Sequence, residues 1–394
     1  MDIFDKCFKF TRAQETIQAG IYPYFIPVSG NDGPVVQMDG HEVIMIGSNN
    51  YLGLTHDPRV IEAAVEATKK YGTSCSGSRF LNGTLDLHIE LEEKLARFLN
   101  REAALIFSTG YMSNLGAIST IAGRDDYLIL DKSDHASIYA GVKAANGTNI
   151  KRYIHNDLHS LEKVMSELEP DKGKIIISDG VFSMEGDIID PEVIKIAKKY
   201  NARIYVDEAH GLGVLGEHGR GSIEYLGLED QVDIIMSTFS KSLAAIGGLI
   251  AGPKPVIDYI KHFASPLIFS AAPTAAATAT VIKTLEIIEN EPEHQKRLKH
   301  TSSRMRKELK NIGFDIGHCQ DTPIIPIYIR NDEKTFYFWR QLFDHGVFAN
   351  AVISPAVAPD QALIRTSFMS THSDEHLDKV LEILEKVAKQ IGLI

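Results

Sequence analysis

The sequence has few cysteines and no long run of apolar residues. Only three of its 394 residues are cysteine, at Cys7, Cys75 and Cys319, and none of them has the C-x-x-C spacing of a metal site. An odd number of widely separated cysteines argues against a disulfide framework, so we expect a reducing, cytoplasmic environment and no metal ion. The longest apolar runs, such as Leu243–Ala251, are far shorter than the ~20 residues that a membrane-spanning helix needs.

Basic residues are also fewer than acidic residues. Lys and Arg number 41 against 52 Asp and Glu, which gives a formal net charge of -11. This balance argues against general affinity for nucleic acid or for an anionic membrane surface, but it leaves room for a local basic pocket. The first residues, MDIFDKCFKFTRAQE, are charged throughout and lack the apolar core of a signal peptide, so we expect none.

The pattern of apolar residues divides the chain into three segments. Residues 1–55 are predicted to form an N-terminal arm. From 56 to 290, short apolar runs alternate with amphipathic stretches, which predicts a large α/β domain with a mostly parallel central sheet and helices on both faces. Residues 291–394 have the pattern of a smaller α+β domain. The predicted strands of the large domain are Ala103–Phe107, Tyr127–Asp131, Lys174–Asp179, Arg203–Asp207, Asp233–Phe239 and Gly248–Ala251.

Ligands of open parallel sheets bind beyond the carboxyl ends of the strands, so the residues that follow each predicted strand are the candidates for a site. After Ala103–Phe107 comes a turn, Ser108–Tyr111, that leads into a helical stretch. The free N–H groups at such a helix start suit a phosphate, but an ordinary strand-to-helix turn explains the pattern at least as well. This turn carries neither G-x-G-x-x-G nor the P-loop motif, which disfavours a nucleotide-binding protein.

Two further strands end near ionisable residues. Asp207 ends one strand and is followed by His210. A poorly solvated carboxylate stays ionised best beside a cation, such as a protonated pyridine nitrogen; the alternative is a helix N-cap. Lys241 follows Asp233–Phe239 between two serines, and a desolvated lysine of this kind often forms a Schiff base; the alternative is a lysine that reaches solvent. An anion cradle, a carboxylate and an amine at one edge fit a cofactor with a phosphate, a pyridine nitrogen and an aldehyde.

Several long segments together resemble a known family. They are GTSCSGSRFLNGTLDLHIELEEKLA, FSTGYMSN, DHASIYAG, DGVFSMEGD, VDEAHGLGVLGEHGRG and TFSKSLAAIGG. These segments resemble the α-oxoamine synthases, which are fold-type I pyridoxal-phosphate enzymes, and the likeness runs from about Gly47 to the C-terminus. The resemblance implies the fold-type I architecture, pyridoxal 5′-phosphate (PLP) as the cofactor, and a homodimer with shared active sites.

The resemblance also implies roles for individual residues. Lys241 would bind the cofactor as an imine and act as the base that removes the Cα proton of the substrate. Asp207 would pair with the pyridine nitrogen, and His135 would stack on the ring, although a capping or core histidine is the alternative for His135 alone. His210 and Ser183 would lie near the phenolic oxygen of the ring.

The remaining implied ligands bind the cofactor phosphate and the amino acid. The phosphate ligands are Gly110 and Tyr111 through their backbone, Thr238 and Ser240 through their hydroxyls, and Ser270 of the neighbouring subunit. Arg365 would hold the amino acid carboxylate by a bidentate pair, helped by Asn50; a surface ion pair is the alternative for Arg365. Some members of the family carry an arginine in the segment that matches NAVISPAVAP, where this chain has Ile353, so carboxylate binding rests on Arg365.

Within the family, the segments YPYF, SGSRFLNGTLDLH, FSTGYMSNLG and TFSKSLA most resemble the bacterial serine palmitoyltransferases. That resemblance implies condensation of L-serine with a long-chain acyl-CoA (palmitoyl-CoA), with loss of carbon dioxide, to give 3-ketodihydrosphingosine, the first step of sphingolipid synthesis. The alternatives are 8-amino-7-oxononanoate synthase, glycine C-acetyltransferase, and a non-catalytic subunit of the same fold, which should lack Lys241. Because the product is a long-chain lipid, peripheral contact with a membrane is compatible with this function.

Overall fold

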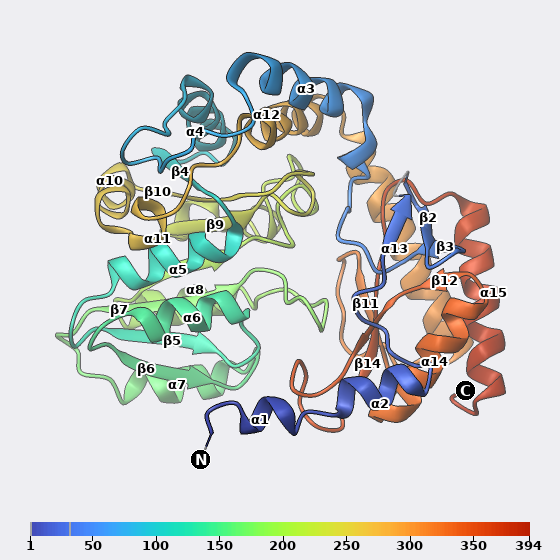
Figure 1. The fold of residues 1–394 in the computed structure, drawn as a ribbon. Coiled ribbons are helices and arrows are strands. Elements are labelled where there is room, and N and C mark those ends of the chain that lie inside the picture. The colour runs from blue at the N-terminus through green and yellow to red at the C-terminus, as the bar shows by residue number, and fades with distance from the viewer. Residues whose placement is uncertain (1, 31–32) are drawn as a thin grey trace. The chain divides into compact units, whose positions relative to one another are not determined.

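The computed structural model describes residues 2–30 and 33–394, which form two compact units (Figure 1). The smaller unit contains the residues up to Ser48 together with Leu298–Ile394, and the larger unit contains Asn49–Arg297. Helix α13 (Glu293–Ile312) begins in the larger unit and ends in the smaller one. The segment boundaries expected from the sequence, at residues 55 and 290, stay predictions.

A seven-stranded sheet forms the centre of the larger unit, with the strand order β4-β10-β9-β8-β7-β5-β6 (Figure 1). β10 is antiparallel to both of its neighbours, and the other pairs are parallel. The sheet confirms the predicted, mostly parallel α/β fold. Its strands are β4 (Ala103–Phe107), β5 (Tyr127–Asp131), β6 (Asn149–Tyr153), β7 (Lys174–Asp179), β8 (Arg203–Asp207), β9 (Ile234–Thr238) and β10 (Gly248–Gly252).

Helices cover both faces of this sheet, as predicted. On one face, alternate strand residues such as Leu128 and Ile177 pack against α5, α6 and α10. On the other face, α7 and α8 pack against each other and against β6 and β8, as right-handed connections between parallel strands require. The helices are α3 (Pro58–Tyr71), α4 (Asp86–Phe98), α5 (Gly110–Ile121), α6 (Ala136–Ala144), α7 (Leu158–Ser166), α8 (Glu192–Lys199), α9 (Ser222–Tyr225), α10 (Lys254–Phe263), α11 (Ser265–Ile268) and α12 (Ala275–Asn290), with the 3₁₀ turns η1 (Leu54–His56) and η2 (Glu229–Gln231).

The smaller unit is an α+β structure with two sheets, ordered β1-β2-β3-β12 and β11-β14-β13. Its core is rich in aromatic side chains: Phe338, Trp339 and Phe343 are buried, and the last two rings stack at 5.6 Å. Large buried rings of this kind supply much of the apolar area in a small core. Its elements besides α13 are α1 (Asp5–Phe8), α2 (Arg12–Gln18), β1 (Val28–Gly30), β2 (Val35–Met38), β3 (His41–Met45), β11 (Ile324–Tyr328), α14 (Asp332–Asp344), β12 (Val347–Phe348), β13 (Asn350–Val352), β14 (Leu363–Ser367) and α15 (Asp374–Gln390).

The loop after β8 contains the segment GLGVLG (Gly211–Gly216), which matches the letters of G-x-G-x-x-G. In a dinucleotide-binding fold this motif forms a tight turn between a strand and a helix. Here the next helix, α9, begins only at Ser222, and the buried Glu208 holds the loop by accepting the backbone N–H of Ser222 and Ile223 at 2.8 and 2.9 Å. The glycines therefore serve a loop around a buried carboxylate and do not form a nucleotide site.

Two properties of the described residues bear on function. Every helix among them is too short or too polar to cross a bilayer. Within residues 2–30 and 33–394, no group of three or more His, Cys, Asp and Glu side chains is arranged to hold a metal ion.

Candidate active site

A cavity of about 300 Å³ lies at the carboxyl edge of the seven-stranded sheet. It therefore occupies the edge at which ligands of parallel α/β sheets bind. The predicted residues that line it are Gly110, Tyr111, His135, Ser183, Asp207, His210, Thr238, Ser240 and Lys241. Sequence reasoning did not predict its other lining residues, which are Thr109, Ser137, Asp179, Val181, Ala209, Met236, Ile246 and Gly247.

The start of α5 forms one wall of this cavity. Thr109 caps the helix, since its Oγ1 accepts the N–H of Met112 at 3.1 Å. At Gly110, a Cβ would lie 2.6 Å from the side chain of Thr238, so only glycine fits there without displacing that strand. The hydroxyl oxygens of Thr238 and Ser240 lie 2.9 Å apart beside the helix start. A helix N-terminus flanked by hydroxyls is a site suited to a phosphate.

Asp207 ends β8 and is only 3% exposed. Its Oδ2 accepts a hydrogen bond from Nδ2 of Asn114 at 2.7 Å, and its Oδ1 accepts the N–H of Ala209 at 2.9 Å. Asn114 in turn accepts from the hydroxyl of Tyr205 at 2.7 Å and lies 2.8 Å from Ser137 Oγ. The carboxylate is thus fixed in one orientation. Sequence reasoning missed Asn114, although its place one helical turn after Gly110 puts it on the same side of α5.

A second carboxyl group, Asp179, lies at the end of the neighbouring strand. It pairs with Asp207 in the β7–β8 ladder, lines the cavity and is 4% exposed. Burial, the charge of Asp207 and that of Asp134 raise the pKa of Asp179 well above its usual range, and the charge of Lys241 opposes them. Two like-charged groups at one buried edge are costly unless a cation or a proton compensates them. The sequence showed Asp179 only as a strand end.

Two histidines lie on loops at the same edge. His135 is the N-cap of α6, and its Nδ1 lies 2.7 Å from Ser137 Oγ. Burial lowers the pKa of His135; the charge of Asp207 opposes this and that of Lys241 adds to it. His210 follows β8, and its Nδ1 lies 2.7 Å from the hydroxyl of the buried Tyr51, a second residue that sequence reasoning missed.

Lys241 lies in the loop that joins β9 to β10. The loop is closed by Phe239, whose N–H donates to the carbonyl of Gly247 at 2.9 Å and whose carbonyl accepts the N–H of Ala245 at 2.9 Å. Ala244 adopts a φ of 54° within it. The half-buried Lys241 lines the cavity and is electrostatically coupled to His135 and to Asp179. The amine is therefore presented to the cavity from a short, closed loop.

Three predicted residues are not among those that line this cavity. Ser270 is half-buried and follows α11. Asn50 donates from Nδ2 to Thr55 Oγ1 at 2.8 Å. Arg365 lies on β14 of the smaller unit, is 4% exposed, and its Nη1 lies 3.5 Å from Ser367 Oγ. Their proposed roles stay predictions.

The groups around the cavity match the three parts of PLP. The close approach of Gly110 to Thr238 leaves the start of α5 open for a phosphate. A fixed carboxylate suits a protonated pyridine nitrogen, and a half-buried lysine amine suits an aldehyde. The donor set therefore fits this cofactor.

Comparisons with known proteins agree with this geometry. The family model described as aminotransferase class I and II matches residues 41–384. A serine palmitoyltransferase of Sphingobacterium spiritivorum is 50% identical over 382 residues, 97% of this chain and 95% of that protein. An 8-amino-7-oxononanoate synthase of Thermoanaerobacter pseudethanolicus is 39% identical over 394 residues, 100% of this chain and 99% of that protein.

Solved structures give the same result. A structure of serine palmitoyltransferase from S. paucimobilis with a bound PLP–myriocin aldimine superimposes with a TM-score of 0.96 and 34% sequence identity, and each chain is covered to 100%. These similarities confirm the predicted fold-type I architecture and the resemblance to the α-oxoamine synthases. The chain therefore belongs to the aminotransferase class I and II family.

Proposed function

We propose that this chain is a PLP-dependent serine palmitoyltransferase, which condenses L-serine with palmitoyl-CoA, with loss of carbon dioxide, to give 3-ketodihydrosphingosine. The observation that carries this proposal is the convergence of Lys241, Asp207 and the start of α5 on one cavity. The 50% identity to the Sphingobacterium enzyme, over nearly the whole of both chains, supports the choice of substrates.

Different residues of the cavity would bind different parts of the cofactor. Lys241 would bind its aldehyde carbon, Asp207 its ring nitrogen, and Gly110, Thr238 and Ser240 its phosphate. Tyr111 would add a backbone donor. When bound, the cofactor supplies an electron sink that stabilises negative charge on the Cα of the amino acid.

The protein orients the reactants and moves the protons. Asp207, held by Asn114, would keep a proton on the ring nitrogen, and His135, which also lines the cavity, would pack against the ring. Nζ of Lys241 accepts the Cα proton of serine. A new C–C bond then joins this Cα to the thioester carbonyl carbon, and the CoA thiolate leaves. The serine carboxyl group departs as carbon dioxide, and the proton held on Nζ of Lys241 returns to Cα. His210 and Ser183 are proposed to hydrogen-bond the phenolic oxygen, and Arg365 with Asn50 to bind the serine carboxylate.

We propose that a second copy of the chain completes the site. Segments 77–83 and 269–273 lie side by side, since Ala272 N–H donates to the carbonyl of Gly77 at 2.9 Å. They present Leu81 and Phe269, which are 80% and 84% exposed, next to Ser270. Exposed apolar side chains that gather in one place support an interface between subunits. Light scattering should give the mass of a dimer, and Phe269→Ser should lower it; a monomeric wild-type chain would contradict this arrangement.

A substrate panel tests the proposed reaction. Serine, alanine and glycine are each combined with palmitoyl-, pimeloyl- and acetyl-CoA, and initial rates are measured on PLP-saturated protein. The highest kcat/KM is expected for serine with palmitoyl-CoA. A preference for alanine with pimeloyl-CoA would favour the second candidate, an 8-amino-7-oxononanoate synthase, which the 39% identity to the Thermoanaerobacter enzyme supports. The cytoplasmic location and peripheral membrane contact stay predictions.

A further inference from the structure

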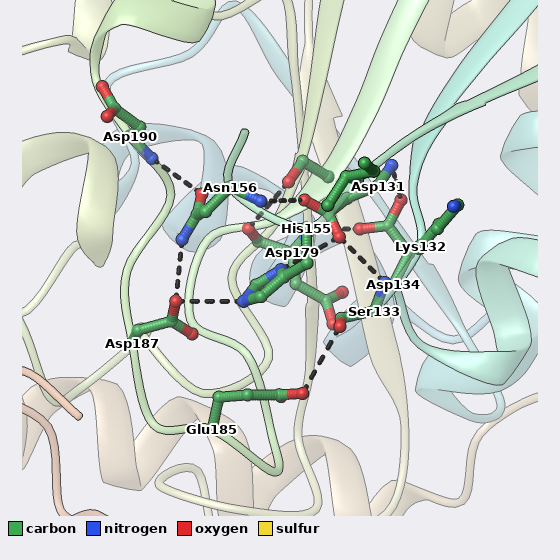
Figure 2. Close-up of polar contacts among 12 residues, drawn as sticks. Asp131, Lys132, Ser133, Asp134, His155, Asn156, Asp179, Glu185, Asp187 and Asp190 are labelled. Carbon is green, nitrogen blue, oxygen red and sulfur yellow. Dashed lines mark hydrogen bonds and ion pairs between the residues drawn. The ribbon is translucent and has the colours of Figure 1, made fainter. Parts of the chain in front are cut away.

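A network of acidic side chains surrounds His155 (Figure 2). His155 itself is not among the residues that line the cavity. His155 follows β6, and its side chain is 22% exposed. Its Nδ1 lies 3.0 Å from Oδ1 of Asp131, and its Nε2 lies 3.0 Å from Oδ2 of Asp187. The side chain of Asp131 is fully buried and that of Asp187 is 13% exposed. One imidazole ring thus joins the carboxylate at the end of β5 to a carboxylate in the loop that follows β7.

The geometry requires a positively charged ring. Both partners are carboxylates, and Asp131 already accepts backbone N–H groups at both oxygens, from Ser133 at 2.8 Å and Asn156 at 2.9 Å. A neutral imidazole has a single N–H, so two hydrogen bonds to ionised carboxylates need the imidazolium. Burial by itself would lower the pKa of His155, but its hydrogen bonds to Asp131 and Asp187 outweigh that effect and raise the pKa to about 10.

On one side, this ion pair fixes the turn that leads into His135. Asp131 ends β5, and its carboxylate holds the N–H of Ser133 within the turn. The buried Asp134 accepts the N–H of Asp131 at 2.9 Å and the N–H of Asp179 at 3.0 Å, which fastens the turn to the end of β7. The next residue, His135, is the N-cap of α6 and lines the cavity. The position of that ring thus depends on the acids behind it.

On the other side, the ion pair fixes the loop that carries Ser183. The carbonyl of Asp187 accepts the N–H of Phe182 at 3.0 Å, and its Oδ2 also accepts from Nδ2 of Asn156 at 2.8 Å. The ring of Phe182 packs edge-on against His155, with centroids 4.4 Å apart. Both loops that present side chains to the cavity from this end of the sheet are therefore bound to the same imidazole.

We propose that His155 is a positioning residue, a cation shared by Asp131 and Asp187 that holds the loops of His135 and Ser183 at a fixed separation across the cofactor cavity. The proposal rests on the proposed function, because it takes this cavity as the PLP site. Without His155, two buried carboxylates would remain without their counter-charge, and the loops would separate to hydrate them.

The test compares His155→Gln with His159→Gln, the same substitution four residues later at an exposed position of α7. Three quantities are measured for each protein: the melting temperature of the apo form, the visible circular dichroism per bound PLP, and kcat with KM for serine. Asp187→Asn and the double variant with His155→Gln complete a thermodynamic cycle, because the double variant removes both charges together.

His155→Gln should displace His135 and Ser183. Its kcat should therefore fall by about tenfold or more, and the circular dichroism of the bound cofactor should change. His159→Gln should match the wild type. The double variant should be less impaired than the product of the two single effects. A lower melting temperature alone, with kcat and circular dichroism unchanged, would overturn the proposal, and so would effects that simply multiply.

Two controls keep the result interpretable. Should His155→Gln fail to fold, Asp187→Asn is judged by the same measurements. It removes the charge of the more exposed of the two carboxylates, since the side chain of Asp187 is 13% exposed and that of Asp131 is fully buried. A wild-type chain that binds no PLP would contradict the proposed function itself, whereas a PLP-binding wild type with an unaffected His155→Gln would contradict only the role of His155.

Discussion

The two edges of the central sheet both have cavities, but their charges are arranged differently. The cavity at the amino edge, near the starts of β5, β7, β8 and β9, has a volume of about 430 Å³ and is the larger one. Its charged groups have hydrogen-bond partners within the chain: Arg203 Nη1 lies 2.8 Å from Asp233 Oδ1, and Nζ of Lys174 donates to two backbone carbonyls at 2.9 Å. Lys174 and the Arg203–Asp233 pair are thus satisfied by groups of the protein itself.

At the carboxyl edge, buried carboxyl groups gather beside Lys241 instead. Asp179 and Asp207 are neighbours in the ladder, and Asp134 lies close behind them. Burial and these neighbours raise the pKa of Asp179, which is the pattern expected where a cationic ligand belongs. The candidate active site is therefore distinguished by its buried, unbalanced carboxyl groups. It is not distinguished by its volume, because it is the smaller of the two cavities.

The largest difference between the two edges should appear when one lysine is removed from each. Lys241→Ala should lower turnover by about 10³-fold or more, because the chain loses both the cofactor linkage and the base. Its apo melting temperature should stay near that of the wild type. Lys174→Met should do the reverse, losing about 1–3 kcal/mol of stability as two carbonyls lose their donor, with kcat unchanged. Retained turnover in Lys241→Ala would contradict the assignment.

Replacing one aspartate at each edge by asparagine should give the next largest difference. Asp207→Asn should lower kcat by roughly 10²-fold, since an amide cannot balance a protonated ring nitrogen. PLP should still bind, which absorbance spectra can check. Asp233→Asn at the opposite edge should change stability by less than about 1 kcal/mol, because its partner Arg203 is 78% exposed. Near-normal turnover in Asp207→Asn would remove that residue from the mechanism.

A smaller effect should follow from loosening Asp207 without removing it. Asn114→Ala deletes the 2.7 Å hydrogen bond to Oδ2 of Asp207. We expect kcat to fall by about tenfold, with a weaker change for Ser137→Ala, which leaves that bond in place. Equal effects of the two variants on steady-state kinetics would show that Asn114 does not act through the carboxylate.

The last prediction concerns stability at the carboxyl edge, which should depend on pH. The pKa of His155 is raised to about 10, so its contribution to the free energy of unfolding is complete below about 6.5 and is lost as pH rises toward 10. The charged groups that face it are Asp131, Asp187 and Glu185. Denaturant titrations from pH 6 to 10 should show a decline that is flatter in His155→Gln, by at most about 1.4 kcal/mol per pH unit. An unchanged slope would argue against the charged ring.

Much of the fold could be predicted because its central strands are short apolar runs. The predicted bounds of β4, β5, β7 and β8 are those of the structure, and β9 lies within Asp233–Phe239. The edge strand β6 was missed because most of its residues, in the sequence NIKRY, are exposed. The antiparallel direction of β10 also went unpredicted, although so short a link to β9 cannot form a parallel crossover.

The site could be predicted where a residue follows a strand and has an unusual chemistry, as with Lys241 and Asp207. Asn114 was missed because an asparagine inside a helix looks ordinary until its partner is known. Asp179 looked like an ordinary strand end, and only its register with Asp207 gives it meaning. The role of Ser270 depends on a second copy of the chain, and the role of Arg365 depends on the bound amino acid. Both roles stay predictions.

The hairpin that carries Lys241 has a mechanical consequence. β9 and β10 are inner strands, hydrogen-bonded on both sides, and the loop between them is closed by Phe239 and Gly247. The ends of this loop can therefore move only if the hydrogen bonds of β9 and β10 to their neighbouring strands are broken. In the proposed mechanism, rotation about the bonds of the four methylene carbons of the lysine would provide the displacement of the amine, while the backbone of the loop stays in place.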